Sequence, residues 1–354
     1  MDYHHKYLKY KSKYYKLKKF LQGGSVNMVN ANNILCMTIF NNLEGASKIF
    51  SPLGITFAIA LLQLAATDKT EKEIYDLLGY KYEPLELESI HGLFNNDNIT
   101  FKNIILVVSD GKINKEYADA TDRLVTFTNH IDTMTQNIIT ENDLTQIVLI
   151  NILNFRMEWF NGFNTSDTTR MLFHKTNMVD MMHQVNKFAY YENDYLQAIE
   201  MLYVHTDYVM GIILPVFQEE NFLINTPYNI PKFTINDINN FIDKLEYTEV
   251  ELYVPKFQDK KNIDLVPILQ KLGVNSLFDP NKVNLNITTS ETAISKFIHE
   301  VTINVDERGT NIASINTQKR SVETKFFRAD HVFVYYIRHV PTNTLLFFGD
   351  YQGN

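Results

Sequence analysis

Apolar residues follow helix-like and strand-like spacings in turn from residue 27 onward. Residues 49–78 have a helical pattern in two pieces, with the break at Thr67 and Asp68, and Thr70 is placed to cap the second piece, which Gly79 closes. Strand patterns occur in seven runs, at residues 104–108, 147–155, 208–214, 249–254, 300–305, 332–337 and 344–348. Several of these runs are apolar on both faces, so each needs cover on two sides. The pattern therefore predicts a layered α+β body.

A different pattern precedes this body. Between residues 3 and 21, tyrosines and leucines recur at four- and three-residue steps with lysines between them, and Gly23 and Gly24 end the pattern. We expect residues 1–24 to form a basic Lys/Tyr-rich helix or leader. Residues 27–354 contain no Pro/Gly/Ser-rich linker and no internal repeat, which predicts a single domain. Two roles for the leader stay open, a solvated helix or one that binds a helical partner or an anionic surface.

Charge is distributed unevenly between these two parts. The net charge is −8, yet residues 1–24 hold seven lysines against Asp2 alone, or +6, so the remaining residues sum to −14. An acidic body disfavours nucleic acid as a partner. Cys36 is the single cysteine, which precludes an intrachain disulfide and suits a reducing compartment. Because no apolar run fits a secretory signal peptide or a transmembrane segment, we expect an intracellular location rather than secretion.

Residues that could carry chemistry are sparse. The sequence has no glycine-rich phosphate loop, no cysteine pair and no histidine pair at metal-ligand spacing, so we expect no cofactor and no metal site. Ser51, His299 and Asn151 could be selected as a hydrolytic triad. A hydrolase presents its serine on a sharp turn such as GxSxG, whereas Ser51 lies in IFSPLG, before an apolar helix that it can cap. We therefore do not expect these three residues to form a catalytic triad.

Six segments resemble the serpins, the family with the serine protease inhibitor fold, in serpin order and at near-serpin spacing. They read KIFSPLGITFAIALLQLAATDKTEKEIYDLLGY, VLINILNFRMEWFNGF, MMHQVNKFAYYENDYLQAIEMLY, ELYVPKFQDKKNIDLVPILQKLGVNSLF, HEVTINVDERGT and FRADHVFVYYIRHVPTNTLLFFGDY. The resemblance implies an α+β serpin fold over residues 27–354, with three β-sheets, about eight or nine helices and an exposed reactive-centre loop at about residues 307–326. The leader also resembles those of large DNA virus proteins, which implies an infected host cell or a virion as the location.

The resemblance implies a monomeric protease inhibitor, and not an enzyme, that acts as a suicide substrate. In this family a target protease, here expected to be of the serine type, cleaves the exposed loop, and the cut loop inserts as a new strand into a large sheet. The recognition residue is expected to be Arg320 or Glu323. The usual distance from Gly309 places the cut after Glu323, whereas Arg320 suits a trypsin-like pocket but lies 11 residues past Gly309, three fewer than expected. A non-inhibitory serpin-like binding protein is the alternative.

The resemblance also assigns a hinge to the loop. It comprises Glu307, Gly309, Thr310, Ile312, Ala313 and Ser314. Gly309 gives the backbone freedom, and Thr310 is small and β-branched, as in inhibitory members. From Ile312 onward the sequence departs from the run of Ala, Gly and Ser that these members favour. Alternation would turn Asn316 and Gln318 toward the core, where an unpaired amide is costly, so we expect insertion that is weaker or slower than usual.

Two further groups of residues are implied at the large sheet. The shutter beneath the sheet comprises Ser51, Asn151 and His299. Gly54 stands where a second serine is usual, which we expect to loosen the shutter's hydrogen bonds. The breach, where insertion starts, is implied to contain Trp159 and an ion pair between Lys256 and Glu307.

Overall fold

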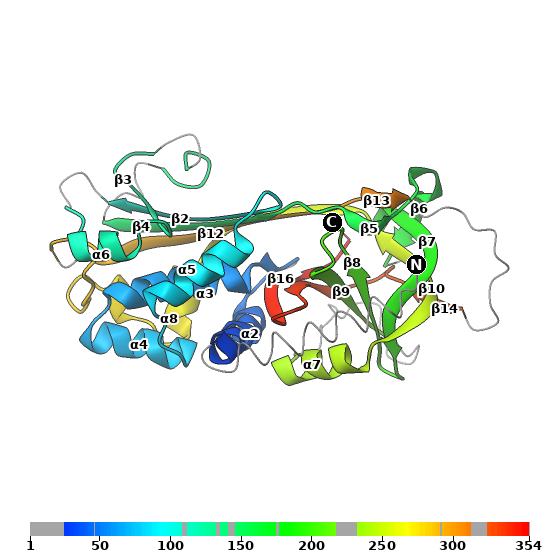
Figure 1. The fold of residues 1–354 in the computed structure, drawn as a ribbon, viewed down its shortest axis with the longest axis horizontal. Coiled ribbons are helices and arrows are strands. Elements are labelled where there is room, and N and C mark those ends of the chain that lie inside the picture. The colour runs from blue at the N-terminus through cyan, green and yellow to red at the C-terminus, as the bar shows by residue number, and fades with distance from the viewer. Residues whose placement is uncertain are drawn as a thin grey trace.

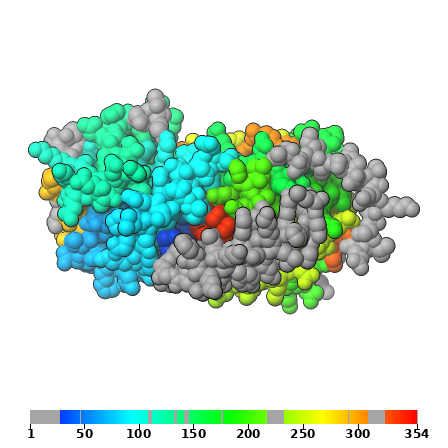
Figure 2. All heavy atoms as spheres, in the orientation of Figure 1, coloured from blue at the N-terminus to red at the C-terminus, as the bar shows by residue number. Residues whose placement is uncertain are grey.

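The computed structural model describes residues 25–45, 47–107, 112–131, 135–140, 146–174, 177–216, 232–290, 292–312 and 324–353. For residues 25–27 and 309–312 it describes the backbone alone. Within these ranges the chain forms seven α-helices, two 3-10 helices and three β-sheets. The molecule is elongated, with most helices (blue to cyan) at one end and most strands of the largest sheet (green to yellow) at the other (Figures 1 and 2). The predicted leader, residues 1–24, lies outside the described residues.

One long sheet has five strands in the order β11-β12-β4-β2-β3. Their bounds are β2 (Ile99–Val107), β3 (Thr126–Thr128), β4 (Ile147–Phe155), β11 (Phe257–Asp264) and β12 (Ile294–Val305). β12 and β4 are parallel neighbours, in register from Ile294 opposite Ile147 to Thr302 opposite Asn154. Helices lie beneath this sheet (Figure 1), and Ile139 packs against an isoleucine-rich cluster that includes residues of β2, β4 and β12. Cover on both faces explains why β4 is a nearly continuous apolar run.

The largest sheet has nine strands, ordered β1-β16-β15-β9-β8-β7-β10-β14, with β6 beside β7. Their bounds are β1 (Ile49–Phe50), β6 (Thr169–Phe173), β7 (Asn177–Glu192), β8 (Leu196–Leu202), β9 (Tyr208–Pro215), β10 (Glu246–Pro255), β14 (Lys325–Arg328), β15 (Phe333–His339) and β16 (Thr344–Tyr351). β16 is buried at every position and packs against the helices. The sheet therefore shares one hydrophobic core with the helical end of the molecule.

A third sheet pairs β5 (Trp159–Gly162) with β13 (Gly309–Ile312) in parallel. β5 follows β4 and β13 follows β12 along the chain, and both lie at the same end of the long sheet (Figure 1). The backbone of the predicted hinge thus runs alongside β5 in the direction of β12.

The helices are α2 (Ser25–Asn42), α3 (Pro52–Ala65), α4 (Asp68–Leu78), α5 (Pro84–Phe94), α6 (Lys115–Ala120), α7 (Ile235–Lys244) and α8 (Val266–Lys271), with 3-10 turns η2 (Thr165–Asp167) and η4 (Ser276–Phe278). α3 is buried along almost its whole length. Ser51 caps it as predicted, because the Ser51 Oγ accepts a hydrogen bond from the Gly54 N–H at 3.0 Å. Among the described helices, none combines the length and the apolar content needed to cross a membrane.

The helical prediction for residues 49–78 is wrong in two details. Ile49 and Phe50 form strand β1, because they pair with β16 at the edge of the nine-stranded sheet. Thr70 does not cap the second helix, which begins at Asp68 with Thr67 in the N-cap position. The Thr70 side chain is instead buried and donates a hydrogen bond to the Ser276 Oγ at 3.2 Å.

Candidate functional site

The parallel junction between β4 and β12 is the centre of the candidate site, and we refer to it as the seam. It comprises residues 147–154 of β4 and residues 294–302 of β12. After β12 ends at one end of the seam, the chain forms β13, and the next described strand is β14. The predicted reactive-centre loop is therefore anchored at both ends by strands, and its first strand adjoins the seam (Figure 1).

A buried hydrogen-bond network crosses the middle of the seam. His299 of β12 lies opposite Asn151 of β4, and the His299 Nδ1 to Asn151 Oδ1 distance is 2.7 Å. The Ser51 backbone N–H donates to the His299 Nε2 at 2.9 Å, and the Asn151 Nδ2 donates to the Asn103 Oδ1 at 2.8 Å. The structure thus brings together the three predicted shutter residues. It adds Asn103 of β2, which no pattern in the sequence distinguishes from the chain's many other asparagines.

The network fixes the protonation of His299. Because its Nε2 accepts a hydrogen bond from a backbone N–H, the proton of the neutral ring lies on Nδ1 and is donated to Asn151. Burial lowers the pKa of His299 from 6.5 to about 3. The ring is therefore neutral near pH 7, and protonating it would add a charge to a fully buried position.

Gly54 does not loosen this network. A Cβ at position 54 would lie 2.4 Å from the Asn151 Oδ1 and 3.2 Å from the His299 ring. The absence of a side chain lets the first turn of α3 approach the amide of Asn151 closely. Gly54 therefore makes room for the hydrogen bonds that link β4, β12 and α3, contrary to the expectation from the sequence.

Trp159 lies at the end of the seam from which the loop departs. Its indole Nε1 donates to the Asp306 carbonyl oxygen at 2.7 Å, and its backbone N–H donates to the Arg308 carbonyl oxygen at 3.0 Å. The indole also stacks on Tyr203, with ring centroids 4.5 Å apart. Trp159 thus fastens the chain directly after β12 to β5 and, through Tyr203, to the segment that follows β8.

The predicted ion pair is present at the same end. The Lys256 Nζ lies 2.8 Å from a carboxylate oxygen of Glu307, and the Thr168 hydroxyl donates to the other oxygen at 3.0 Å. Burial alone would raise the pKa of Glu307, but hydrogen bonds from Lys256, from backbone and from Thr168 outweigh it and lower this pKa below its ordinary value. Because Lys256 is 44% exposed, the pair contributes less than a buried one would.

The loop itself is described only at its two ends. Glu307 precedes β13, and Gly309, Thr310 and Ile312 lie within it. The other predicted residues, namely Ala313, Ser314, Arg320 and Glu323, lie outside the described residues.

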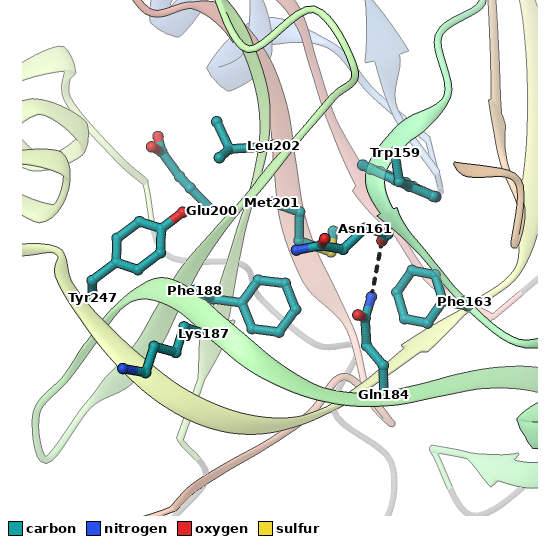
Figure 3. Close-up of a pocket in the computed structure, with 10 residues that line it drawn as sticks. All are labelled: Trp159, Asn161, Phe163, Gln184, Lys187, Phe188, Glu200, Met201, Leu202 and Tyr247. Atoms are coloured by element: carbon teal, nitrogen blue, oxygen red, sulfur yellow. Dashed lines mark hydrogen bonds between the residues drawn. The ribbon is translucent and has the colours of Figure 1, made fainter. Parts of the chain in front are cut away.

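A small pocket adjoins Trp159 where β5, β7, β8 and β10 meet (Figure 3). Its lining includes Phe163, Gln184, Phe188 and Glu200, and the Gln184 side chain donates to the Asn161 carbonyl oxygen at 3.3 Å. The pocket volume of about 10 Å³ is close to the space that one water molecule requires. It is therefore too small for an organic ligand.

Comparison with known proteins identifies the class that this fold and seam define. The sequence model of the family described as Serpin (serine protease inhibitor) matches residues 30–132 and 126–352. The chain therefore belongs to the serpin family, a family of protease inhibitors rather than of enzymes.

Individual relatives agree with this assignment. A serpin-like protein of Acanthamoeba polyphaga mimivirus, R700, is 36% identical over 401 residues, and the alignment covers 100% of both chains. Plasminogen activator inhibitor 1 of Sus scrofa is 26% identical, over 88% of this chain and 89% of its own. The solved structure of native protease nexin-1 with heparin superposes with a TM-score of 0.80 at 22% identity, covering 93% of this chain and 99% of that one. The predicted α+β serpin fold is confirmed, and the relatives include a viral protein.

Proposed function

We propose that this serpin inhibits an endopeptidase as a suicide substrate, through cleavage of its loop and insertion of the cut loop into the seam. The observation that carries the proposal is the parallel seam, with the loop leaving from the end of β12. A strand that turns back from β12 and enters the seam would run antiparallel to both β12 and β4. Such a strand can form backbone hydrogen bonds with both β12 and β4. Insertion would therefore replace one parallel ladder of hydrogen bonds by two antiparallel ladders.

Insertion of this kind would release substantial free energy. An inserted strand of about ten residues gains about ten net backbone hydrogen bonds, and at roughly 1 kcal/mol each this is on the order of 10 kcal/mol. A protease that is acylated by the loop at that moment would be carried along the sheet. The intact state would then persist because the barrier is high, and not because it has the lowest free energy.

The described contacts across the seam are consistent with such a barrier. An entering strand must separate His299 from Asn151, which now share a 2.7 Å hydrogen bond across the two strands. It must also release the Trp159 indole from the Asp306 carbonyl oxygen, and reversal of the hinge would pull Glu307 away from Lys256. The predicted shutter and breach residues would thus hold the seam closed until the loop is cut.

The proposal also covers the recognition residue, the target protease and the location. Arg320 or Glu323 is the proposed recognition residue, and the target is a serine protease that meets a monomer of this chain. Residues 27–354 act as one domain behind the basic leader of residues 1–24. The mimivirus relative supports a viral origin and hence an infected host cell or a virion as the location.

A second function is favoured by one feature of the loop sequence. Asn316 and Gln318 occupy positions that alternation from Thr310 turns inward on insertion. Each unpaired buried amide costs about 1–3 kcal/mol, which favours a serpin-like binding protein that is cut without inserting.

Incubation with trypsin separates the two functions. An inhibitor forms a covalent adduct of the two proteins that survives denaturing electrophoresis, whereas a non-inhibitory relative gives only the cleaved chain. Trypsin whose catalytic serine is replaced by alanine is the control, because it binds the loop without acylation. Exclusive cleavage at every ratio of the two proteins, both by trypsin and by a glutamate-specific serine protease, would refute the inhibitory function. Arg320→Ala and Glu323→Ala variants then identify the recognition residue.

A further inference from the structure

Helix α5 presents apolar side chains to solvent as well as to the core. Its buried residues are Leu87, Ile90 and Phe94. Leu85, in contrast, is 74% exposed and Leu93 is 46% exposed, and the exposed Ser89 lies between them. At 3.6 residues per turn these three residues lie within an arc of about 80°, along about 12 Å of the helix axis. We call Leu85, Ser89 and Leu93 the outer face of α5, a helix that lies at the surface in Figure 2 (cyan).

Negative charge borders the outer face. Residues 83–94 contain Glu83, Glu86 and Glu88 but no lysine or arginine. Glu88 is exposed and lies one turn after Leu85, so its carboxylate is a neighbour of that leucine on the helix surface. A segment that covers the outer face should therefore combine an apolar stripe with positive charge.

The basic leader, residues 1–24, has both properties. Its tyrosines and leucines recur at helical spacing from Tyr3 to Leu21, and its net charge is +6. The predicted helix over residues 3–21 would be about 28 Å long, whereas the 11 residues of α5 span about 16 Å. The leader is therefore long enough to cover the whole of α5.

The leader is joined to the folded body beside the start of α5. α2 begins at Ser25, directly after the glycine pair that ends the leader. The hydroxyl of Tyr82, which precedes α5 by two residues, donates to the Met28 carbonyl oxygen at 3.4 Å. Leu21 precedes Met28 by seven residues, a reach of at most about 25 Å. A tether of this length gives an effective concentration in the millimolar range, which favours a contact within the chain over one between chains.

We propose that the basic leader folds back as a helix onto the outer face of α5 in the same chain. Its tyrosines and leucines cover Leu85 and Leu93, and its lysines lie beside the three glutamates. The contact involves neither the seam nor the loop, so it is independent of the proposed function. α5 also packs against β2, where the His91 Nε2 lies 3.3 Å from the Phe101 carbonyl oxygen. The docked leader would thus support the helices beneath the five-stranded sheet.

Photochemical cross-linking of the full chain tests this contact. Tyr10 is replaced by the photoreactive p-benzoylphenylalanine, the protein is irradiated, and mass spectrometry locates the cross-linked peptides. We expect cross-links to residues 83–94, in a product that migrates as a monomer in denaturing electrophoresis. Cross-links that occur only in a dimer, only at other surfaces or not at all would overturn the proposal.

Matched variants identify the surface. Leu85→Lys combined with Leu93→Lys removes the apolar contacts and adds repulsion, so we expect the yield of the cross-link to fall fivefold or more. Leu172→Lys makes the same change at a leucine of β6 that is 56% exposed, and it should leave the yield unchanged. An unchanged yield in the double variant would contradict docking on α5. Sedimentation of the wild-type chain with phosphatidylserine vesicles, without a cross-link to α5, would assign the leader to an anionic membrane and likewise overturn the proposal.

Discussion

Asn103, Asn151 and His299 lie on three adjacent strands, and the polar atoms of Asn151 bond to both of its neighbours. Because the group is buried, an atom that loses its partner costs about 1–3 kcal/mol. A substitution near this group therefore changes the free energy of unfolding through the hydrogen bonds of neighbouring residues as well as through the change in side-chain volume.

Gly54→Ser is expected to lower the melting temperature by a few degrees. The new Cβ would lie 2.4 Å from the Asn151 Oδ1, so the amide would have to turn away from His299. Overpacking of this kind costs about 1–3 kcal/mol. Gly92→Ser on α5 is the matched control, because no atom lies within 4 Å of a Cβ there. Equal melting of the two variants, followed by circular dichroism, would contradict this account.

Acid is expected to destabilise the folded chain through two buried histidines. Burial lowers the pKa of His299 to about 3 and that of His339 to about 4, against an ordinary value of 6.5. Below pH 6.5 the unfolded chain binds these protons and the folded chain does not. The free energy of unfolding should therefore be highest above pH 6.5 and fall between pH 6.5 and about 4, by up to about 1.4 kcal/mol per pH unit for each histidine.

A variant isolates this effect. His339→Gln removes one of the two groups and should reduce the dependence of the melting temperature on pH across that window, whereas His205→Gln, at an exposed position, should leave it unchanged. A wild-type melting temperature that is constant between pH 7 and 5 would be incompatible with these buried neutral rings.

At the scale of elements, insertion of the loop depends on the path of the chain where β12 ends and β13 begins. β13 pairs with β5 in parallel, so the hinge would have to reverse its direction to enter the seam. Alternation along an inserted hinge would place Thr310 inside and Asn311 outside. This difference between adjacent residues gives a test of insertion that does not depend on which residue the protease recognises.

Thr310→Arg is expected to convert the inhibitor into a substrate of trypsin. A guanidinium at an inward position would be buried without a partner during insertion, at a cost of several kcal/mol, so hydrolysis of the acylated protease would overtake the trapping step. Asn311→Arg carries the same charge on the outward face and should still form the adduct. Adduct formed by Thr310→Arg as efficiently as by wild type would mean that this part of the loop does not enter the sheet.

At the scale of the whole molecule, the seam joins a helical end to a strand-rich end through one continuous core. Insertion of a strand beside β4 would add a sixth strand to the five-stranded sheet, which packs on α3. The consequence should therefore appear as a change in global stability.

Cleavage of the loop is expected to raise the melting temperature by roughly 10 °C or more. The cut chain can form about ten further backbone hydrogen bonds at roughly 1 kcal/mol each, and for a chain of 354 residues each kcal/mol corresponds to about 1.3 °C. Intact and trypsin-cut proteins are compared by calorimetry, after mass spectrometry has located the cut in the loop. Cut Thr310→Arg is the control, and it should melt like the intact protein. A cut wild-type chain that shows no gain would mean that the seam stays empty.

Individual elements show which strands and site residues could be predicted from local sequence patterns. The apolar run at residues 147–155 predicted β4 with its observed bounds, because a strand covered on both faces is apolar throughout. The 16-residue strand β7 was not predicted as a strand, since its burial alternates irregularly along its length and its ends extend beyond the core. Asn103, Asp306 and Thr168 were not predicted as site residues, because each acts only through a partner that is distant in sequence.

The sequence alone determined the alternation of helices and strands, the Ser51 cap and, through six ordered segments, the family. These features depend on local spacing or on the order of motifs along the chain. The tertiary structure decided that Gly54 accommodates Asn151, that Ile49 and Phe50 form a strand, and that Asn103 bonds to Asn151. The reason is physical, since each of these depends on the distance between side chains that only the packing of separate elements brings together.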